Sequence, residues 1–348
     1  MRRIALLVES LDESSLARLA EWSVQVPLPS SDVERTLIVL RPAPTRVAAL
    51  TAAGYSVIGL NIAANDRPGT LRQLRQVLIR ERFAAIHVFG RTAAEILAIA
   101  RLGIAIPIAI TESADEAPHA KLLARQWHRL CVRRMRPLNL NWGLPDELPT
   151  PTASADNRSI VVVGTMDSFP EWEWQVRAFN SLRFAEPNGS IQWIGTGKIR
   201  TRLQTYYRQV MQFDAPCEWL SDRPDLPERM ANARLVWVMD RRSRATALGI
   251  LAAKIGVPVL ATLGSDLCRR LPMFPDDRLI PWGGVAELAR ASRRIFQTDP
   301  STDSESFRLA ESVRAEFPWQ ALAESLSTGY HQLATADLSA ASSASTSL

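Results

Sequence analysis

Short apolar runs alternate with longer amphipathic segments along nearly the whole chain. The apolar runs lie at 4–8, 36–40, 55–60, 85–89 and 106–111 in the first half, and at 159–163, 191–194, 234–239 and 257–260 in the second. In most of them apolar residues follow one another with a single polar residue in the run, instead of standing only at every second position, which is typical of strands buried on both faces. Because parallel strands need a crossover segment between them, this alternation predicts an α/β protein with parallel sheets.

The composition divides the chain near residue 150. Residues 137–157 are rich in Pro, Asn, Ser and Asp without hydrophobic periodicity, which indicates a linker. A chain of 348 residues is long enough for two domains. We predict a first domain over 1–150 and a second over 151–333, whose terminal helical stretch is broken at Pro318 for a crossover towards the first domain. Residues 334–348 are mostly Ala, Ser and Thr, which predicts a disordered tail.

The bulk composition, 47% hydrophobic and 22% charged, is that of an ordinary globular protein. The net charge of +5 comes almost entirely from arginine, since lysine occurs only at Lys121, Lys198 and Lys254. This bias has two explanations, a codon preference of the genome or the binding of phosphates by guanidinium groups. Composition alone favours the first.

The cysteines and the hydropathy limit the cellular context. Cys131, Cys217 and Cys268 are far apart and form no C-x-x-C pair, which argues against a disulfide framework and a zinc site. We expect no metal and no cofactor. No segment approaches the apolar length of a membrane span, so we expect a cytoplasmic protein.

The segment 241–262, RRSRATALGILAAKIGVPVLAT, predicts a helix, a tight turn and a buried strand. Its 245–254 stretch is rich in Ala, Leu and Ile, which form helices at little cost. Gly256 stands where a helix end needs a left-handed residue, and Pro258 prevents the helix from continuing.

In order and spacing, these motifs together resemble the retaining GT-B glycosyltransferases of the family-four type. In the second half the resemblance is carried by VVVGTMDSFPEWEWQVRAF, WIGTGKIRTRLQ, the 241–262 segment and EFPWQALAESLSTGYHQL. The first half matches more loosely, through AGYSVIGL, AAIHVFGRTA and IAIPIAITES. The resemblance implies two Rossmann-like domains facing across a cleft. It also implies transfer of a sugar from a nucleotide-diphosphate donor, held by the second domain as a co-substrate, to an acceptor.

The charged residues that the family uses are replaced. Ser243 and Leu251 stand at the positions of the two glutamates of the signature helix. Thr165 and Pro170 stand where the family has a phosphate-binding arginine and lysine, and its first-domain histidine falls near Ser113. Two functions are therefore open, a divergent glycosyltransferase and a catalytically silent relative that binds a nucleotide sugar, a glycan or a partner protein.

A substitute phosphate site is predicted at the start of the 245–254 helix. Unpaired amides and the helix dipole favour an anion at such a terminus, and arginine side chains next to it add charge. The candidate donor and phosphate-binding residues are Gly164, Thr165, Arg241, Arg242, Ser243, Arg244 and Thr246. The alternative is a solvated basic helix start with Ser243 as its N-cap.

Weaker candidates lie elsewhere in the chain, and no catalytic residue is assigned. Lys198 belongs to a G-x-G turn, and His87 and Arg91 lie at the end of the 85–89 strand, where a hydrogen-bonded structural histidine is the favoured interpretation. The basic run 129–136 has no pattern of a nucleic-acid-binding module, so we expect no nucleic-acid partner. Contact with a membrane surface is conceivable, with a glycan or a lipid-linked molecule as acceptor.

Overall fold

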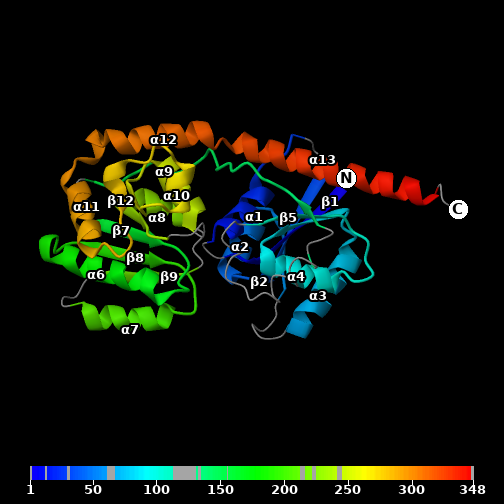
Figure 1. Cartoon of the computed structure of the whole chain (residues 1–348), viewed down its shortest axis with the longest axis horizontal. Coiled ribbons are helices and arrows are strands. Elements are labelled where there is room, and N and C mark those ends of the chain that lie inside the picture. The colour runs from blue at the N-terminus through cyan, green and yellow to red at the C-terminus, as the bar shows by residue number, and fades with distance from the viewer. Residues whose placement is uncertain are drawn as a thin grey trace. The chain divides into compact units, whose positions relative to one another are not determined.

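The computed structural model describes residues 2–11, 14–29, 32–60, 67–112, 131, 135–154, 156–211, 216–221, 225–240 and 245–345. The predicted α/β class is confirmed, since each of two compact units contains a six-stranded sheet (Figure 1). The first unit comprises Met1–Leu11, Leu16–Asp146 and Phe317–Leu348, and the second comprises Asp12–Ser15 and Glu147–Glu316. The chain passes from the first unit to the second between Asp146 and Glu147, near the predicted boundary at residue 150. The last helix belongs to the first unit.

The sheet of the first unit has the strand order β3-β2-β1-β4-β5-β6, with every neighbouring pair parallel. This is the order of a Rossmann sheet. Its strands are β1 (Arg2–Ser10), β2 (Val33–Arg41), β3 (Ser56–Gly59), β4 (Ala85–Phe89), β5 (Ile108–Thr111) and β6 (Arg136–Pro137). Its helices are α1 (Ser15–Gln25), α2 (Pro44–Ala52), α3 (Arg67–Glu81), α4 (Arg91–Ala100) and α13 (Trp319–Ser345).

Helices α3 and α4 cover one face of the first sheet, and α13 contacts the other face at β4. Ile86 and Val88 of β4 join the core under α3 and α4, whereas His87 points to α13 and contacts Tyr330. Both faces of β4 are therefore buried, which explains why apolar residues predominate in it and why its one polar residue, His87, is hydrogen-bonded. Helix α13 continues to Ser345, into the stretch whose composition predicts a disordered tail, because its alanines are strong helix formers.

The second unit repeats the same topology. Its sheet order is β12-β11-β10-β7-β8-β9, again with parallel pairs. The strands are β7 (Ser159–Val163), β8 (Ser190–Ile194), β9 (Cys217–Leu220), β10 (Leu235–Val238), β11 (Val259–Thr262) and β12 (Leu279–Ile280). The helices are α6 (Phe169–Ala185), α7 (Arg200–Val210), α8 (Leu226–Asn232), α9 (Thr246–Ile255), α10 (Asp266–Arg270), α11 (Val285–Gln297) and α12 (Ser304–Glu316). Short 3-10 turns lie at η3 (Asp276–Arg278) and η4 (Pro300–Thr302).

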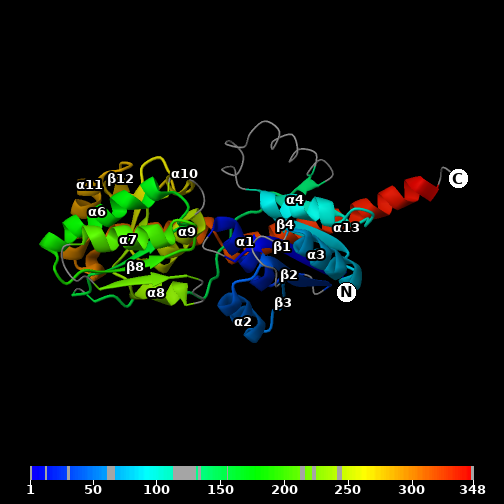
Figure 2. The ribbon, with the colours of Figure 1, turned by 90° about the horizontal axis from the view of Figure 1, so that it is seen from below.

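Helices cover both faces of the second sheet (Figure 2). Helix α6 packs against α7 and α11, and helix α9 packs against α8, α10 and α12. All ten residues of α9 are buried, and the helix ends at Gly256, which has a positive φ of 99°, as its sequence predicts. The predicted helix–turn–strand unit of 241–262 is thus confirmed for its described part.

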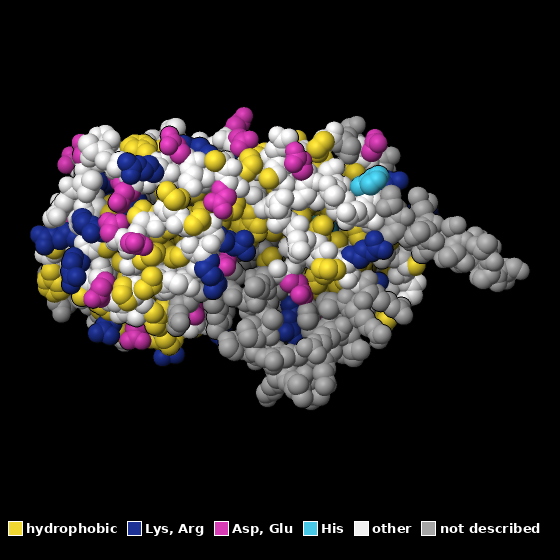
Figure 3. All heavy atoms as spheres, turned by 45° about the horizontal axis from the view of Figure 1, so that its top comes forward, with side chains coloured by type: hydrophobic (Ala, Val, Ile, Leu, Met, Phe, Trp, Pro, Cys, Tyr) yellow, Lys and Arg dark blue, Asp and Glu magenta, His cyan; other side chains and the backbone are white. Residues whose placement is uncertain are grey.

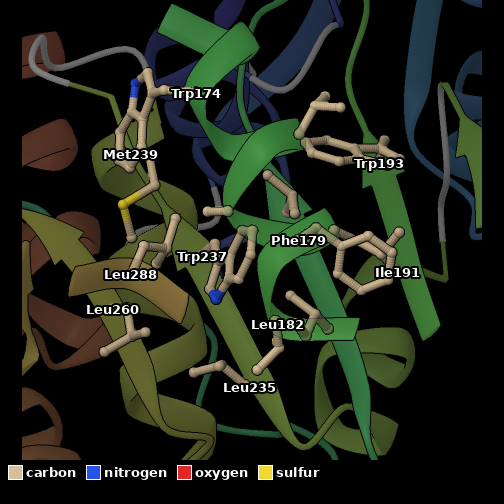
Figure 4. Close-up of a cluster of buried hydrophobic side chains, with 14 of the residues drawn as sticks. Trp174, Phe179, Leu182, Ile191, Trp193, Leu235, Trp237, Met239, Leu260 and Leu288 are labelled. Carbon is tan, nitrogen blue, oxygen red and sulfur yellow. The ribbon is translucent and has the colours of Figure 1, made fainter. Parts of the chain in front are cut away.

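An aromatic core lies between the second sheet and helices α6 and α11 (Figure 4). Trp193 and Trp237 are completely buried in it, and Phe179 and Leu182 reach in from α6. The indole N–H of Trp237 donates to the Ser292 hydroxyl at 3.0 Å, and that hydroxyl donates to the Leu288 carbonyl at 2.8 Å. These two successive hydrogen bonds provide a partner for the indole nitrogen, which is the only polar atom of the buried Trp237 side chain.

We expect Ser292→Ala to lower the free energy of unfolding of the second unit by about 1–3 kcal/mol, because the Trp237 N–H loses its acceptor while staying buried. Urea denaturation followed by tryptophan fluorescence measures the change. The control Thr205→Ala removes a similar hydroxyl-to-carbonyl bond from an exposed position of α7, and should cost less than about 0.5 kcal/mol. Equal losses in both variants would contradict the assigned role of Ser292.

Candidate functional site

A small pocket lies where the strand order of the second sheet reverses. Strands β8 and β10 flank β7 on opposite sides, so the loops after β7 and β10 leave the sheet in different directions. In open α/β sheets, ligands bind at this point beyond the carboxyl ends of the strands. The pocket is lined by Val163, Gly164, Thr165, Glu171, Trp172, Gln175, Met239 and Asp240.

The loop after β7 approaches the start of helix α9. A Cβ atom on Gly164, where φ is 151°, would lie 3.3 Å from the Trp172 ring and 3.8 Å from the Ala245 side chain. The Trp172 indole donates to the Thr165 carbonyl at 3.0 Å and holds the loop in place. The structure therefore brings Gly164, at the start of this loop, towards the helix that begins at Thr246.

The amino end of α9 offers polar groups to this region. The amide of Ala245 donates to Asp240 Oδ2 and that of Ala247 donates to Ser15 Oγ, each at 3.1 Å. Thr246 is only 1% exposed, and its hydroxyl has no hydrogen-bond partner among the described residues. A buried hydroxyl without a partner is unfavourable, and it combines here with the positive end of a ten-residue helix.

The three arginines and the serine predicted at this helix start lie outside the described residues. They are Arg241, Arg242, Ser243 and Arg244, and the same holds for Ser113 in the first half. Leu251, at the position of the second family glutamate, is a buried core residue of α9.

Three polar residues of the pocket were missed by the sequence analysis. Asp240 lies two residues after the end of β10, and Glu171 and Gln175 lie on the first turns of α6. The Gln175 amide donates to the Glu171 carbonyl at 2.6 Å, whereas its Oε1 is buried without a partner in the described part of the chain. The position of Asp240 at the end of an apolar run was the available signal, since parallel strands place such residues at the ligand-binding edge.

The G-x-G turn after β8 owes its glycines to packing. A Cβ atom on Gly195 would lie 2.0 Å from the Gly164 carbonyl oxygen, and one on Gly197 would lie 2.2 Å from that of Met166. The two loops are joined by a 2.8 Å hydrogen bond from the Met166 amide to the Thr196 carbonyl. Lys198 is exposed and does not line the pocket.

His87 is a buried structural residue in the middle of β4. The Thr111 hydroxyl donates its single proton to the Leu138 carbonyl at 2.7 Å, so it accepts from His87 Nε2–H at 2.9 Å. His87 Nδ1 consequently accepts from the Tyr330 hydroxyl at 3.2 Å. Burial lowers the pKa of His87 to about 3, so the ring stays neutral. Arg91, the neighbouring candidate, pairs with Glu95 one helical turn away at 2.9 Å.

On the face drawn in Figure 3, described basic and acidic side chains are interspersed. Within the described ranges, no group of three or more His, Cys, Asp or Glu side chains is arranged to hold a metal ion. The helices of the described part include none with the length and apolar character needed to cross a membrane.

The fold is that of known GT-B glycosyltransferases. The sucrose-phosphate synthase of Thermosynechococcus elongatus superposes with a TM-score of 0.71 at 16% identity, covering 97% of this chain and 100% of that one. The Anabaena protein HepE in complex with UDP and glucose gives a TM-score of 0.73 at 13% identity, over 95% and 100% of the two chains. WaaG, a glycosyltransferase involved in lipopolysaccharide biosynthesis, gives 0.59 at 13% identity over 92% and 97%. No family model and no curated protein matches the sequence.

We expect Gly195→Ala to lower the free energy of unfolding of the second unit by more than 2 kcal/mol, because the new methyl group collides with the Gly164 backbone. Gly264→Ala is the control, since its φ of 74° is also positive but no atom lies within 4 Å of the added Cβ. The control should lose only about 1 kcal/mol. Denaturant titration compares the two, and equal losses would contradict the backbone contact.

The stability of the first unit should fall on acidification because of His87. Its pKa of about 3 lies below the ordinary value of 6.5, so the unfolded chain binds a proton that the folded chain excludes. The contribution of the neutral His87 ring to the free energy of unfolding is complete above pH 6.5. It is lost as the pH falls from 6.5 to 3, at up to about 1.4 kcal/mol per pH unit. Denaturation of wild type and His87→Gln at pH 7.5, 5.5 and 4.5 should show a shallower decline in the variant. His331→Gln removes an exposed histidine as control, and parallel declines for wild type and His87→Gln would refute the assignment.

Proposed function

We propose that this protein is a glycosyltransferase that moves a sugar from a nucleotide-diphosphate donor to an acceptor. The observation that carries the proposal is the pocket at the switch point of the second sheet, where Gly164 and Thr165 meet the start of α9. The Anabaena HepE structures with UDP and with UDP-glucose support a donor of this class, since they have the same fold.

In this proposal the start of α9 binds the donor diphosphate. The helix dipole favours the anion, and the unpartnered Thr246 hydroxyl donates a hydrogen bond to a phosphate oxygen. Gly164 has no side chain, so its backbone approaches α9 closely, and a Cβ atom there would lie 3.8 Å from the Ala245 side chain. Arg242 and Arg244, predicted from the sequence, add the cationic charge that the missing family residues would have supplied.

The carboxylates of the pocket bind hydroxyl groups instead of phosphates. Asp240 and Glu171 line the pocket, and a carboxylate accepts hydrogen bonds from sugar hydroxyls but repels a phosphate. The donor would therefore lie with its diphosphate at Thr246 and a ribose or hexose ring towards Glu171, while Asp240 keeps its hydrogen bond from the Ala245 amide. As the glycosidic bond breaks, negative charge grows on the leaving diphosphate, and the helix terminus and arginines stabilise it.

A second candidate function is binding without turnover. Leu251 is an apolar core residue of α9, so the position of the second family glutamate carries no group that could hydrogen-bond a donor. This observation favours a catalytically silent protein that binds a nucleotide sugar, a glycan or a partner protein. Turnover distinguishes the two functions, whereas donor binding is common to the enzyme and to a silent nucleotide-sugar binder.

We expect UDP to bind the purified full chain, measured by isothermal titration calorimetry. Thr246→Val keeps the size of the side chain, removes its hydroxyl, and should weaken UDP binding about five- to tenfold. The double variant Arg242→Ala and Arg244→Ala should weaken it at least tenfold. Arg208→Ala, an exposed position of α7, is the matched control and should leave the affinity unchanged.

The absence of UDP binding, or binding that none of these substitutions weakens, would overturn the donor site. If UDP binds at this site, release of UDP from UDP-glucose in the presence of acceptor candidates distinguishes an enzyme from a silent binder. Sustained turnover excludes the silent function.

A further inference from the structure

A second pocket lies at the opposite edge of the second sheet from the switch point. Arg234 precedes β10 and lines this pocket, whereas Asp240 follows the same strand and lines the donor pocket. Its walls come from the linker before β7, the turn between α9 and β11, η4 and the first turn of α12. The pocket has a volume of about 270 Å³, enough for a small molecule.

Arg234 is a buried cation whose hydrogen bonds are incomplete. The residue is 2% exposed, and its Nη2 donates to the Ile295 carbonyl at 2.7 Å and to the Thr298 carbonyl at the end of α11. Its Nε has no acceptor, and its Nη1 makes no hydrogen bond, within the described part of the chain. Burial lowers the pKa of Arg234, a sign that its charge lacks full compensation. A guanidinium in this state has capacity for an added acceptor.

The one carboxylate of the pocket wall is already occupied. Asp303 Oδ1 accepts from Arg278 at 2.5 Å and from the Ser306 amide at 3.2 Å, and Asp303 Oδ2 accepts from the Ser306 hydroxyl at 2.8 Å. Neither Asp303 nor Asp299 forms an ion pair with Arg234 in the described residues, although both carboxylates are close enough to raise the pKa of Arg234. Arg234 therefore has no carboxylate partner of its own in the described residues.

Apolar side chains complete the pocket. Val257 and Pro258 form part of the wall beside Arg234, and Phe307 is 53% exposed although it lines the pocket. A large exposed aromatic side chain next to a buried, incompletely bonded cation is a combination that binds an amphipathic anion.

We propose that this pocket binds a small organic carboxylate, whose carboxyl group accepts hydrogen bonds from Arg234 and whose apolar body packs against Val257 and Phe307. A single negative charge suits the pocket better than a phosphate dianion, because the Asp303 carboxylate would repel the second charge. The site lies beyond one end of β10 and the donor site beyond the other, so the two ligands bind independently.

The probe is 4-fluorobenzoate, followed by ¹⁹F NMR on the full chain. We expect saturable binding of one equivalent, and at least tenfold weaker binding of the neutral analogue 4-fluorobenzyl alcohol. Arg234→Met should weaken the benzoate at least tenfold, whereas the exposed control Arg208→Met should leave it unchanged. Ala153→Phe fills the pocket from the linker without changing a charge, and should abolish binding even if Arg234→Met fails to fold.

Saturable benzoate binding that Ala153→Phe abolishes and that excess UDP leaves intact supports the proposal. The absence of saturable binding, unchanged binding in Ala153→Phe, or equal affinity for the alcohol would each overturn it. Displacement by UDP would also overturn it, because the probe would then occupy the donor site. UDP affinity of the Ala153→Phe variant is measured in parallel, so failure of this site and failure of the donor site are separate results.

Discussion

The parallel hydrogen bonding of β7 to β8 on one side and to β10 on the other is the constraint on which the second unit depends. It separates the loops that follow β7 and β10 and leaves a hollow at the edge of the sheet. The same pairing brings the loops after β7 and β8 together, so that Gly195 contacts the Gly164 backbone. The position of the candidate donor site is thus a consequence of strand order, and its side chains add specificity to a place that the backbone has already formed.

The apolar runs of the sequence predict most of this architecture, because strands buried on both faces leave a continuous apolar signal. Ala85–Phe89 matches its prediction residue for residue, and Gly256 ends α9 where the sequence places the turn. The two-residue strands β6 and β12 are too short to leave any signal. Helix α13 continues past residue 334 although the composition predicts disorder there, since alanine-rich sequence suits a helix as well as a tail.

The candidate sites were less predictable, because they depend on contacts between distant segments. Thr246 and Gly164 were identified from their places at a helix start and a strand end. Gln175 lines the candidate donor pocket only because α6 packs on the same core as β7, and no local sequence pattern indicates that packing. No sequence pattern distinguishes Arg234 from the other arginines of the chain. Its distinguishing feature is the hydrogen bond to the end of α11, which only the structure shows. Fold and site therefore differ in what determines them: local periodicity for the former, tertiary packing for the latter.

The hydrogen-bonded chain through His87 has an evolutionary consequence. Tyr330, His87, Thr111 and the Leu138 carbonyl lie on four segments, and Tyr330 is 243 residues from His87 in the sequence. Each donor among these groups has one acceptor, so replacing His87, Thr111 or Tyr330 alone leaves a buried polar group without its partner. Among homologous sequences, positions 87, 111 and 330 should accordingly change as a set. A homologue with an apolar residue at position 87 should also lack the tyrosine hydroxyl at 330, and such covariation could be used to align its carboxyl-terminal helix.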